Sequence, residues 1–95
     1  MSRPEKLVLD FGHIASAEEL HDLLITSLKL PNYYGRNWDA FWDVIASGGV
    51  LPVQLHLIGW SKLESRLPRE AKMMQQCLID YQNEKSVSPC KVDYT

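Results

Sequence analysis

Hydrophobic and polar residues follow a strand period and then a helix period in the first part of the chain. Segment 6–11 alternates, with Leu, Leu and Phe on one side, which predicts a first strand. Ser16–Glu19 reads as a capping box, with Ser at the N-cap and Glu at the third helical position. The helix that it opens repeats leucines on one face up to Leu28. Pro31 ends this helix, because the residue before a proline disfavours helical backbone angles.

A short loop and a second helix follow. Residues 32–36 read Asn-Tyr-Tyr-Gly-Arg, and Gly35 is the position expected to take a positive φ. Asn37 is the predicted N-cap of a short helix from Trp38 to about Ser47. Gly48-Gly49 is expected to end it.

The second half of the chain repeats this succession of elements. Segment 53–57 alternates Val, Leu and Leu with Gln and His, which predicts a strand with one wetter face. Ser61–Glu64 looks like another capping box, and Pro68 suits the first turn of the next helix. That helix has an apolar stripe formed by Met74, Cys77, Leu78 and Tyr81. Segment 90–94 alternates as a last strand.

The order β-α-α-β-α-α-β implies parallel strands joined by right-handed crossovers. We therefore predict a two-layer α/β fold, with a three-stranded parallel sheet and about four helices mainly on one face. The 95 residues, without repeats or low-complexity tracts, are expected to form a single domain over 1–95.

Charge and hydropathy exclude several classes of protein. Ten basic and twelve acidic side chains give a net charge of −2. Direct nucleic-acid or membrane-surface binding is not expected, because both usually need a basic surface. The sequence lacks the roughly 20 consecutive apolar residues of a transmembrane helix. Its first residues do not resemble a secretory signal, so a cytoplasmic location is expected.

The cysteines and histidines do not predict a metal or cofactor site. Cys77 and Cys90 are too few for a disulfide scaffold and lack zinc-site spacing, so both are expected to be reduced and near the core. His13, His21 and His56 are scattered, and no two have metal-ligand spacing.

The predicted second helix has an acidic face. On a helical wheel, Asp39 and Asp43 lie side by side with Ala46 next to them, opposite an apolar arc. The arc contains Trp38, Phe41, Trp42, Val44 and Ile45. On the helix alone, a solvated surface explains the two aspartates. The preceding Tyr33 and Tyr34 favour a binding surface over a merely solvated one. Tyrosines beside paired carboxylates suit an interface with a partner rich in Arg and Lys.

Segment 30–43 also resembles a known family. Its pattern L-P-x-Y-Y-G-x-N-x-D-A-x-W-D is similar to the signature of the barstar family, small intracellular inhibitors of secreted ribonucleases. The resemblance continues more weakly over Lys6 to Asn83. It implies a three-stranded parallel sheet in the order 1-2-3. It also implies that the second helix and the loop before it block the active site of a barnase-like ribonuclease.

The resemblance assigns roles to individual positions. Tyr33 resembles the tyrosine that packs on the catalytic histidine of the nuclease. Asp39 resembles an aspartate that contacts a nuclease arginine, and Asp43 resembles the aspartate that fills the phosphate subsite. The positions that shape or support this surface are matched by Tyr34, Gly35, Asn37 and Trp42.

The chain departs from the family pattern at two positions and shares a third feature. Asp80 stands where the family has a glutamate as a peripheral contact. Gly48 stands where the best-known member has a tryptophan lining the interface, which concerns the identity of the partner. The bond Leu51–Pro52 aligns with one that is cis in the family, and a cis bond is expected here.

Two functions of different classes remain after the residues are weighed. The favoured one is a protein inhibitor, or immunity protein, that forms a 1:1 complex with a basic ribonuclease or ribonuclease toxin. The alternative is a barstar-like regulatory binding module without a nuclease partner. A hydrolase using Asp39 and Asp43 is disfavoured, because acid–base pairs need one pKa raised by burial or a pocket. An enzyme is therefore not expected.

Overall fold

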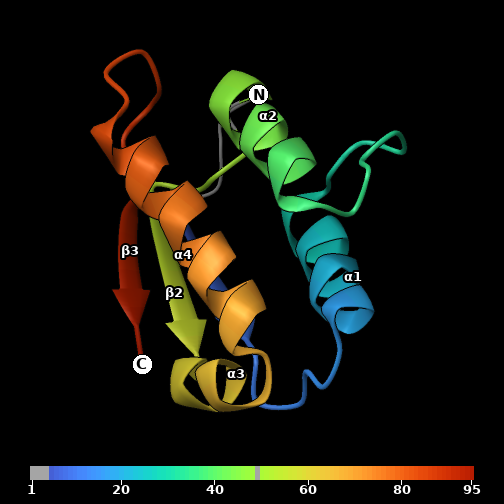
Figure 1. Ribbon diagram of the computed structural model, residues 1–95. Coiled ribbons are helices and arrows are strands. Elements are labelled where there is room, and N and C mark those ends of the chain that lie inside the picture. Colours follow the sequence, from blue (N-terminus) through green and yellow to red (C-terminus); the bar gives the residue numbers. More distant parts are fainter. Residues whose placement is uncertain (1–4, 49) are drawn as a thin grey trace.

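The computed structural model describes residues 5–48 and 50–95, and its elements follow the predicted order (Figure 1). The elements are β1 (Lys6–Asp10), α1 (Ala17–Leu28), α2 (Trp38–Gly48), β2 (Gln54–Ile58), α3 (Trp60–Arg66), α4 (Pro68–Asn83) and β3 (Lys91–Tyr94). The predicted succession β-α-α-β-α-α-β is confirmed.

The three strands form one parallel sheet in the order β1-β2-β3. Leu7 pairs with Leu55, which pairs with Val92. This register brings one apolar residue of each strand into a row across the sheet. The predicted sheet, its parallel sense and its order are confirmed.

Among residues 5–48 and 50–95, the helices cover one face of the sheet, and Figure 1 shows them gathered on that side. Leu9 and Leu57 are buried there, whereas Val8 and His56 belong to the opposite, more accessible face. The alternation predicted for β2 thus divides a helix-covered face from a wetter one.

The core between sheet and helices fixes the position of α2. Phe41 and Ile45 of α2 are buried together with Leu24 of α1 and Met74 of α4. Trp38 is also buried, and its ring meets Phe41 edge-on with centroids 5.5 Å apart. Because these buried residues fix the rotation of α2 against the core, the opposite face of the helix is held toward solvent.

Local signals in the sequence place the starts of three helices correctly. The Ser16 hydroxyl accepts a hydrogen bond from the backbone N–H of Glu19 at 3.1 Å, and Ser16 is the N-cap of α1. The Asn37 carboxamide accepts one from the backbone N–H of Ala40 at 2.7 Å, at the start of α2. Pro68 occupies the first turn of α4. The two side chains accept hydrogen bonds from backbone N–H groups that lack helical partners at a helix start. The proline has no such N–H group to satisfy.

The start of α3 differs from the prediction. Its N-cap is Gly59 rather than Ser61, and no side chain caps it. Gly59 has a φ of 73°, and a Cβ there would lie 2.8 Å from the backbone nitrogen of Gly12. The chain passes from β2 into the helix through this left-handed residue against Gly12, so Ser61 already lies inside the helix.

The expectation of a cis bond at Leu51–Pro52 is wrong. No cis peptide bond occurs within residues 5–48 and 50–95, which include both partners of this bond. Both residues are buried. The bond has the isomer that X–Pro bonds generally favour, by about 0.5–1 kcal/mol.

Candidate protein-binding site

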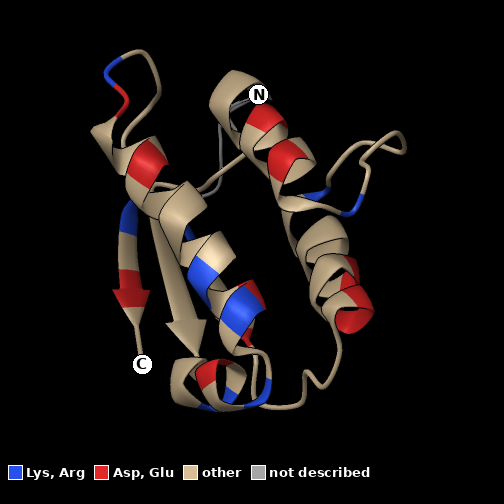
Figure 2. Ribbon diagram, viewed as in Figure 1, with Lys and Arg blue, Asp and Glu red and all other residues tan. Residues whose placement is uncertain are grey.

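The outer face of α2 carries two carboxylates. Asp39 and Asp43 are exposed one turn apart, while Phe41 and Ile45 point into the core. Ala46 is half-buried beside them. The helix contains no Lys or Arg, so this face is purely acidic (Figure 2).

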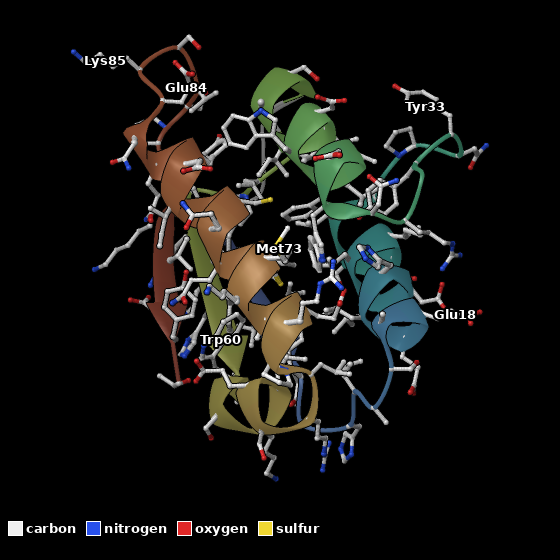
Figure 3. All side chains as sticks on the ribbon, viewed as in Figure 1. Glu18, Tyr33, Trp60, Met73, Glu84 and Lys85 are labelled. Atoms are coloured by element: carbon white, nitrogen blue, oxygen red, sulfur yellow. The ribbon has the colours of Figure 1, made fainter. Side chains whose placement is uncertain are left out.

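The two adjacent tyrosines of the loop lie in opposite environments. Tyr33 is 85% exposed and lies on the outside of the loop (Figure 3), whereas Tyr34 is only 7% exposed. The expectation that both contribute to an aromatic surface is therefore wrong for Tyr34. Its ring packs into the core cluster, and its hydroxyl lies 2.7 Å from Nδ1 of His21 in α1. Tyr34 anchors the loop, and Tyr33 is presented to solvent.

The positive φ of the loop falls on Arg36, with a value of 53°, and not on Gly35. At Gly35, a Cβ would lie close to the Asn37 side-chain nitrogen, at 3.1 Å, and in ordinary contact with the Ala40 Cβ, at 3.6 Å. Arg36 forms an ion pair with Asp22 of α1. The ion pair lies at the residue with the left-handed backbone, where the loop leads into Asn37.

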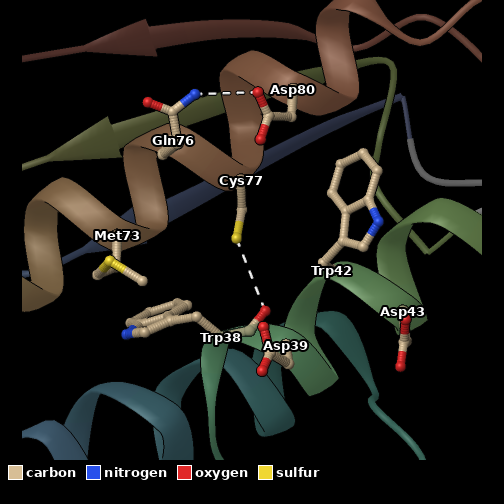
Figure 4. Close-up of a pocket in the computed structure, with 8 residues that line it drawn as sticks. All are labelled: Trp38, Asp39, Trp42, Asp43, Met73, Gln76, Cys77 and Asp80. Carbon is tan, nitrogen blue, oxygen red and sulfur yellow. Dashed lines mark hydrogen bonds between the residues drawn. The ribbon is translucent and has the colours of Figure 1, made fainter.

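A groove of about 450 Å³ runs between α2 and α4 (Figure 4). We call it the α2–α4 groove. It is lined by Trp38, Asp39, Trp42, Asp43, Met73, Gln76, Cys77 and Asp80. Tryptophan, methionine and cysteine side chains form its apolar part, and three carboxylates contribute its charge. In Figure 4, Asp43 stands at the edge of the groove and its carboxylate points away from α4.

Contacts between the two helices hold the groove walls. The indole N–H of Trp38 donates to a carboxylate oxygen of Glu70 at 3.0 Å. The thiol of Cys77 lies 3.7 Å from the backbone carbonyl oxygen of Trp38, to which it donates. The candidate binding groove is thus built on two packed helices.

The field in the groove is negative. None of its lining residues is Lys, Arg or His. Burial, with the charges of Asp80 and Asp39 acting in the same direction, raises the pKa of the Cys77 thiol to about 11. The thiol therefore stays protonated near neutral pH, and the groove suits a cationic ligand.

The fold brings together the acidic positions expected from the sequence. Asp39, Trp42, Asp43 and Asp80 all line the α2–α4 groove, although Asp80 lies 37 positions beyond Asp43 in the sequence. The Asp80 carboxylate accepts a hydrogen bond from the Gln76 side chain at 2.9 Å. Tyr33 is not part of this groove and lines a second hollow, which it shares with Asp43.

Three residues of the α4 wall were not among the site residues predicted from the sequence. Met73, Gln76 and Cys77 share one face of α4 with Asp80, at spacings of three, four and seven residues. Met73 is 41% exposed. An exposed methionine in helical register with Asp80 is the pattern that could have indicated this wall.

No group of three or more metal-ligating side chains comes together in the part of the chain that is described. Cys77 is a half-buried free thiol, and Cys90 is buried. Within the same residues, no helix combines the length and the hydropathy needed to cross a membrane.

Fold and site together define a small α/β protein with a one-sided parallel sheet and an acidic, aromatic groove between two helices. Residues 5–94 match the family described as "Barstar (barnase inhibitor)". The chain belongs to the Barstar family. That description is of an inhibitor and not of an enzyme.

A curated relative is consistent with this assignment. YrdF of Bacillus subtilis (strain 168), which is named "Putative ribonuclease inhibitor", is 42% identical over 52 residues. The matched segment covers 55% of this chain and 57% of YrdF.

Proposed function

We propose that this chain inhibits a basic ribonuclease by covering its active site with the acidic face of α2, the α2–α4 groove and the Tyr33 loop. The observation that carries the proposal is the convergence of Asp39, Asp43 and Asp80 on one groove whose described lining residues include no Lys, Arg or His. A ribonuclease active site uses cationic groups to stabilise charge on the phosphate. Carboxylates on a helix can pair with those cationic groups in place of the phosphate, and the nuclease cannot cleave them.

Each predicted contact has a defined part in this mechanism. Asp43 takes the place of a substrate phosphate, Asp39 pairs with a nuclease arginine, and Asp80 makes a peripheral contact. Tyr33 packs on the catalytic histidine. Trp42 and Ala46 complete the surface, while Tyr34, Gly35 and Asn37 hold the loop and the start of α2.

Preorganisation favours tight binding by this surface. The N-cap at Asn37 and the bond from Trp38 to Glu70 are present in the free protein. Little conformational entropy is then lost when the helix docks. A 1:1 complex of standard interface size is expected, in which charge complementarity also speeds association.

The test is an RNA-hydrolysis assay with barnase, the ribonuclease named in the family description, and with other small basic ribonucleases. Stoichiometric inhibition of at least one enzyme is expected. Asp43→Asn should weaken it strongly. Glu64→Gln is the matched control, because it removes one exposed charge on α3, an element that contributes no residue to the lining of the groove.

Two results would contradict the proposal. If none of the enzymes is inhibited by a folded protein, the inhibitor function is wrong and the partnerless binding module replaces it. If inhibition occurs but Asp43→Asn and Glu64→Gln behave alike, the acidic surface is not the inhibitory one.

A further inference from the structure

The first strand has one backbone edge that faces away from the sheet. In the order β1-β2-β3, β1 pairs with β2 alone among the described residues. Glu5 and Phe11 form backbone hydrogen bonds to β2, at 2.9 and 2.8 Å. Bonding to a neighbouring strand involves every second residue of a parallel ladder. The backbone N–H and C=O groups of Lys6, Val8 and Asp10 therefore point toward the outer edge.

The side chains of β1 are arranged symmetrically about Val8. The strand reads Lys-Leu-Val-Leu-Asp, with opposite charges at its two ends. Lys6, Val8 and Asp10 are exposed on the sheet face opposite the helices, and Val8 is 48% exposed. Leu7 is half-buried and Leu9 is buried on the other face. A strand with this pattern can face a reversed copy of itself with every residue type matched.

We propose that β1 pairs antiparallel with β1 of a second copy of this chain, about a two-fold axis at Val8. Lys6 then lies opposite Asp10 of the second copy, and the two Val8 side chains meet at the axis. These residues direct both backbone groups outward, so each facing pair can exchange two N–H to C=O bonds. The contact is closed, because a two-fold axis uses the same edge of both chains.

The charges select this register among the antiparallel ones. An axis at Lys6 or at Asp10 would place like charges directly opposite each other, which destabilises a strand pair. An axis at Leu7 or at Leu9 would set Val8 against a charged residue and leave the ion pairs unformed. Lysine on an edge strand usually discourages pairing with other chains. In the register centred on Val8, that lysine meets a carboxylate instead.

The other edge of the sheet is less suited to a second copy. β3 has four residues, against five in β1. Lys91 bonds to β2 through its backbone, so the outward backbone groups within β3 belong to Val92 and Tyr94. The Asp93 carboxylate already accepts a hydrogen bond from the Gln54 side chain at 2.9 Å. The β1 edge therefore offers more backbone bonds and a better charge match.

Pairing through β1 is separate from the proposed inhibitory surface. None of the described lining residues of the α2–α4 groove belongs to β1. Each chain of the dimer would keep its own groove, so the proposal does not depend on ribonuclease binding. Two short edge strands bury a small area, and interfaces below about 1,200 Å² are typical of weak complexes. We therefore expect a dimer that forms at high protein concentration.

Sedimentation equilibrium of the whole chain measures this association. The average mass should rise from the monomer value of 10.9 kDa at about 1 μM toward twice that value at about 1 mM. Amide hydrogen exchange locates the contact. The Val8 amide should exchange at least about twofold more slowly at the higher concentration, when half or more of the chains are paired. The Leu9 amide, which faces β2, should exchange at the same rate at both concentrations.

Charge variants test the register. Lys6→Glu should weaken self-association about tenfold, because carboxylates would face each other at both ends of the pair. Asp10→Lys should do the same with two facing lysines. An equal mixture of the two variants should associate about as well as the wild-type chain, since every facing pair again has opposite charges. Lys91→Glu makes the same charge change on β3 and is the matched control, which should leave association unchanged.

Thermal melts establish that each variant is folded, since Asp10→Lys also removes the carboxylate that accepts from the Gly12 N–H at 2.8 Å. If that variant does not fold, the comparison of Lys6→Glu with Lys91→Glu and the exchange of the Val8 amide decide the question.

Four results would overturn the proposal. The first is a monomer at about 1 mM. The second is a stronger effect of Lys91→Glu than of Lys6→Glu, which would place the contact at β3. The third is growth beyond the dimer, which would indicate open pairing of β1 with β3. The fourth is an equal mixture of folded Lys6→Glu and Asp10→Lys that associates no better than either variant alone.

Discussion

The Tyr34 hydroxyl and the Nδ1 atom of His21 lie 2.7 Å apart in a buried hydrogen bond. This bond joins the loop before α2 to the middle of α1. The His21 ring also packs against the Trp38 ring, with centroids 4.6 Å apart. The loop, α1 and the first residue of α2 therefore meet at one histidine.

Replacing Tyr34 by Phe should destabilise the protein. The change leaves His21 Nδ1 buried without the hydroxyl, and an unsatisfied buried polar group costs about 1–3 kcal/mol. Urea unfolding measures the loss. Tyr33→Phe is the matched control, because an exposed hydroxyl should change stability by less than about 0.5 kcal/mol. Equal stabilities of the two variants would contradict an anchoring role for Tyr34.

Stability should fall when the pH drops below the ordinary pKa of histidine. Burial lowers the pKa of His21; Glu70 opposes this effect, and Arg36 adds to it. Below about pH 6.5 the unfolded chain therefore binds a proton that the folded chain still excludes, so acidification favours unfolding. Above that range both states are neutral at this residue, and its contribution to the pH dependence disappears.

The measurement is the free energy of unfolding of the wild-type chain and of His21→Gln at about pH 7.5 and about pH 5.5. The wild-type chain should lose more stability on acidification than the variant, since the variant lacks this titrating group. The same loss in both proteins would show that groups other than His21 cause the dependence.

Replacing Asp43 by Ala should weaken inhibition of the cognate ribonuclease by at least about 2 kcal/mol. The partner's cations would then be buried without their counter-charge, which costs more than the pair itself contributes. Asp39→Ala should cost somewhat less, because Asp39 is expected nearer the interface margin. Inhibition titrations give both values, and unchanged inhibition by folded Asp43→Ala would contradict phosphate mimicry.

The same substitution should leave the free protein folded. The Asp43 side chain is exposed, and Asp39 lies four positions before it on α2. Like charges at this spacing destabilise a helix by roughly 0.2–0.5 kcal/mol, so Asp43→Ala should raise the melting temperature slightly. A clear fall in the melting temperature would mean that Asp43 makes a structural contact.

Gly59→Ala should destabilise the fold by at least about 1 kcal/mol. Gly59 has a φ of 73°, and the new Cβ would meet the Gly12 backbone nitrogen at 2.8 Å. Gly12→Ala is the control, since its Cβ would meet only a flexible Asp10 oxygen at 3.1 Å and its backbone is not left-handed. Thermal melts should rank Gly59→Ala below Gly12→Ala, and the reverse order would contradict the tight turn.

The sequence by itself determined the elements whose signals are local. Apolar periodicity located the strands and the inward faces of α1, α2 and α4. Ser16 and Asn37 marked helix starts because their side chains bond to backbone groups only three positions away. The acidic face of α2 was also readable, since Asp39 and Asp43 are one helical turn apart. The sheet order and the roles of individual site residues came from the family resemblance.

Tertiary structure alone decided which residues meet from distant segments. Tyr33 and Tyr34 are identical in type and adjacent, and only the packing of α1 buries one and exposes the other. Gly59 became a helix cap because the Gly12 backbone approaches it, and Met73 joined the site because α4 packs beside α2. Periodicity reports a residue's own helix or strand, whereas these contacts depend on how separate elements pack.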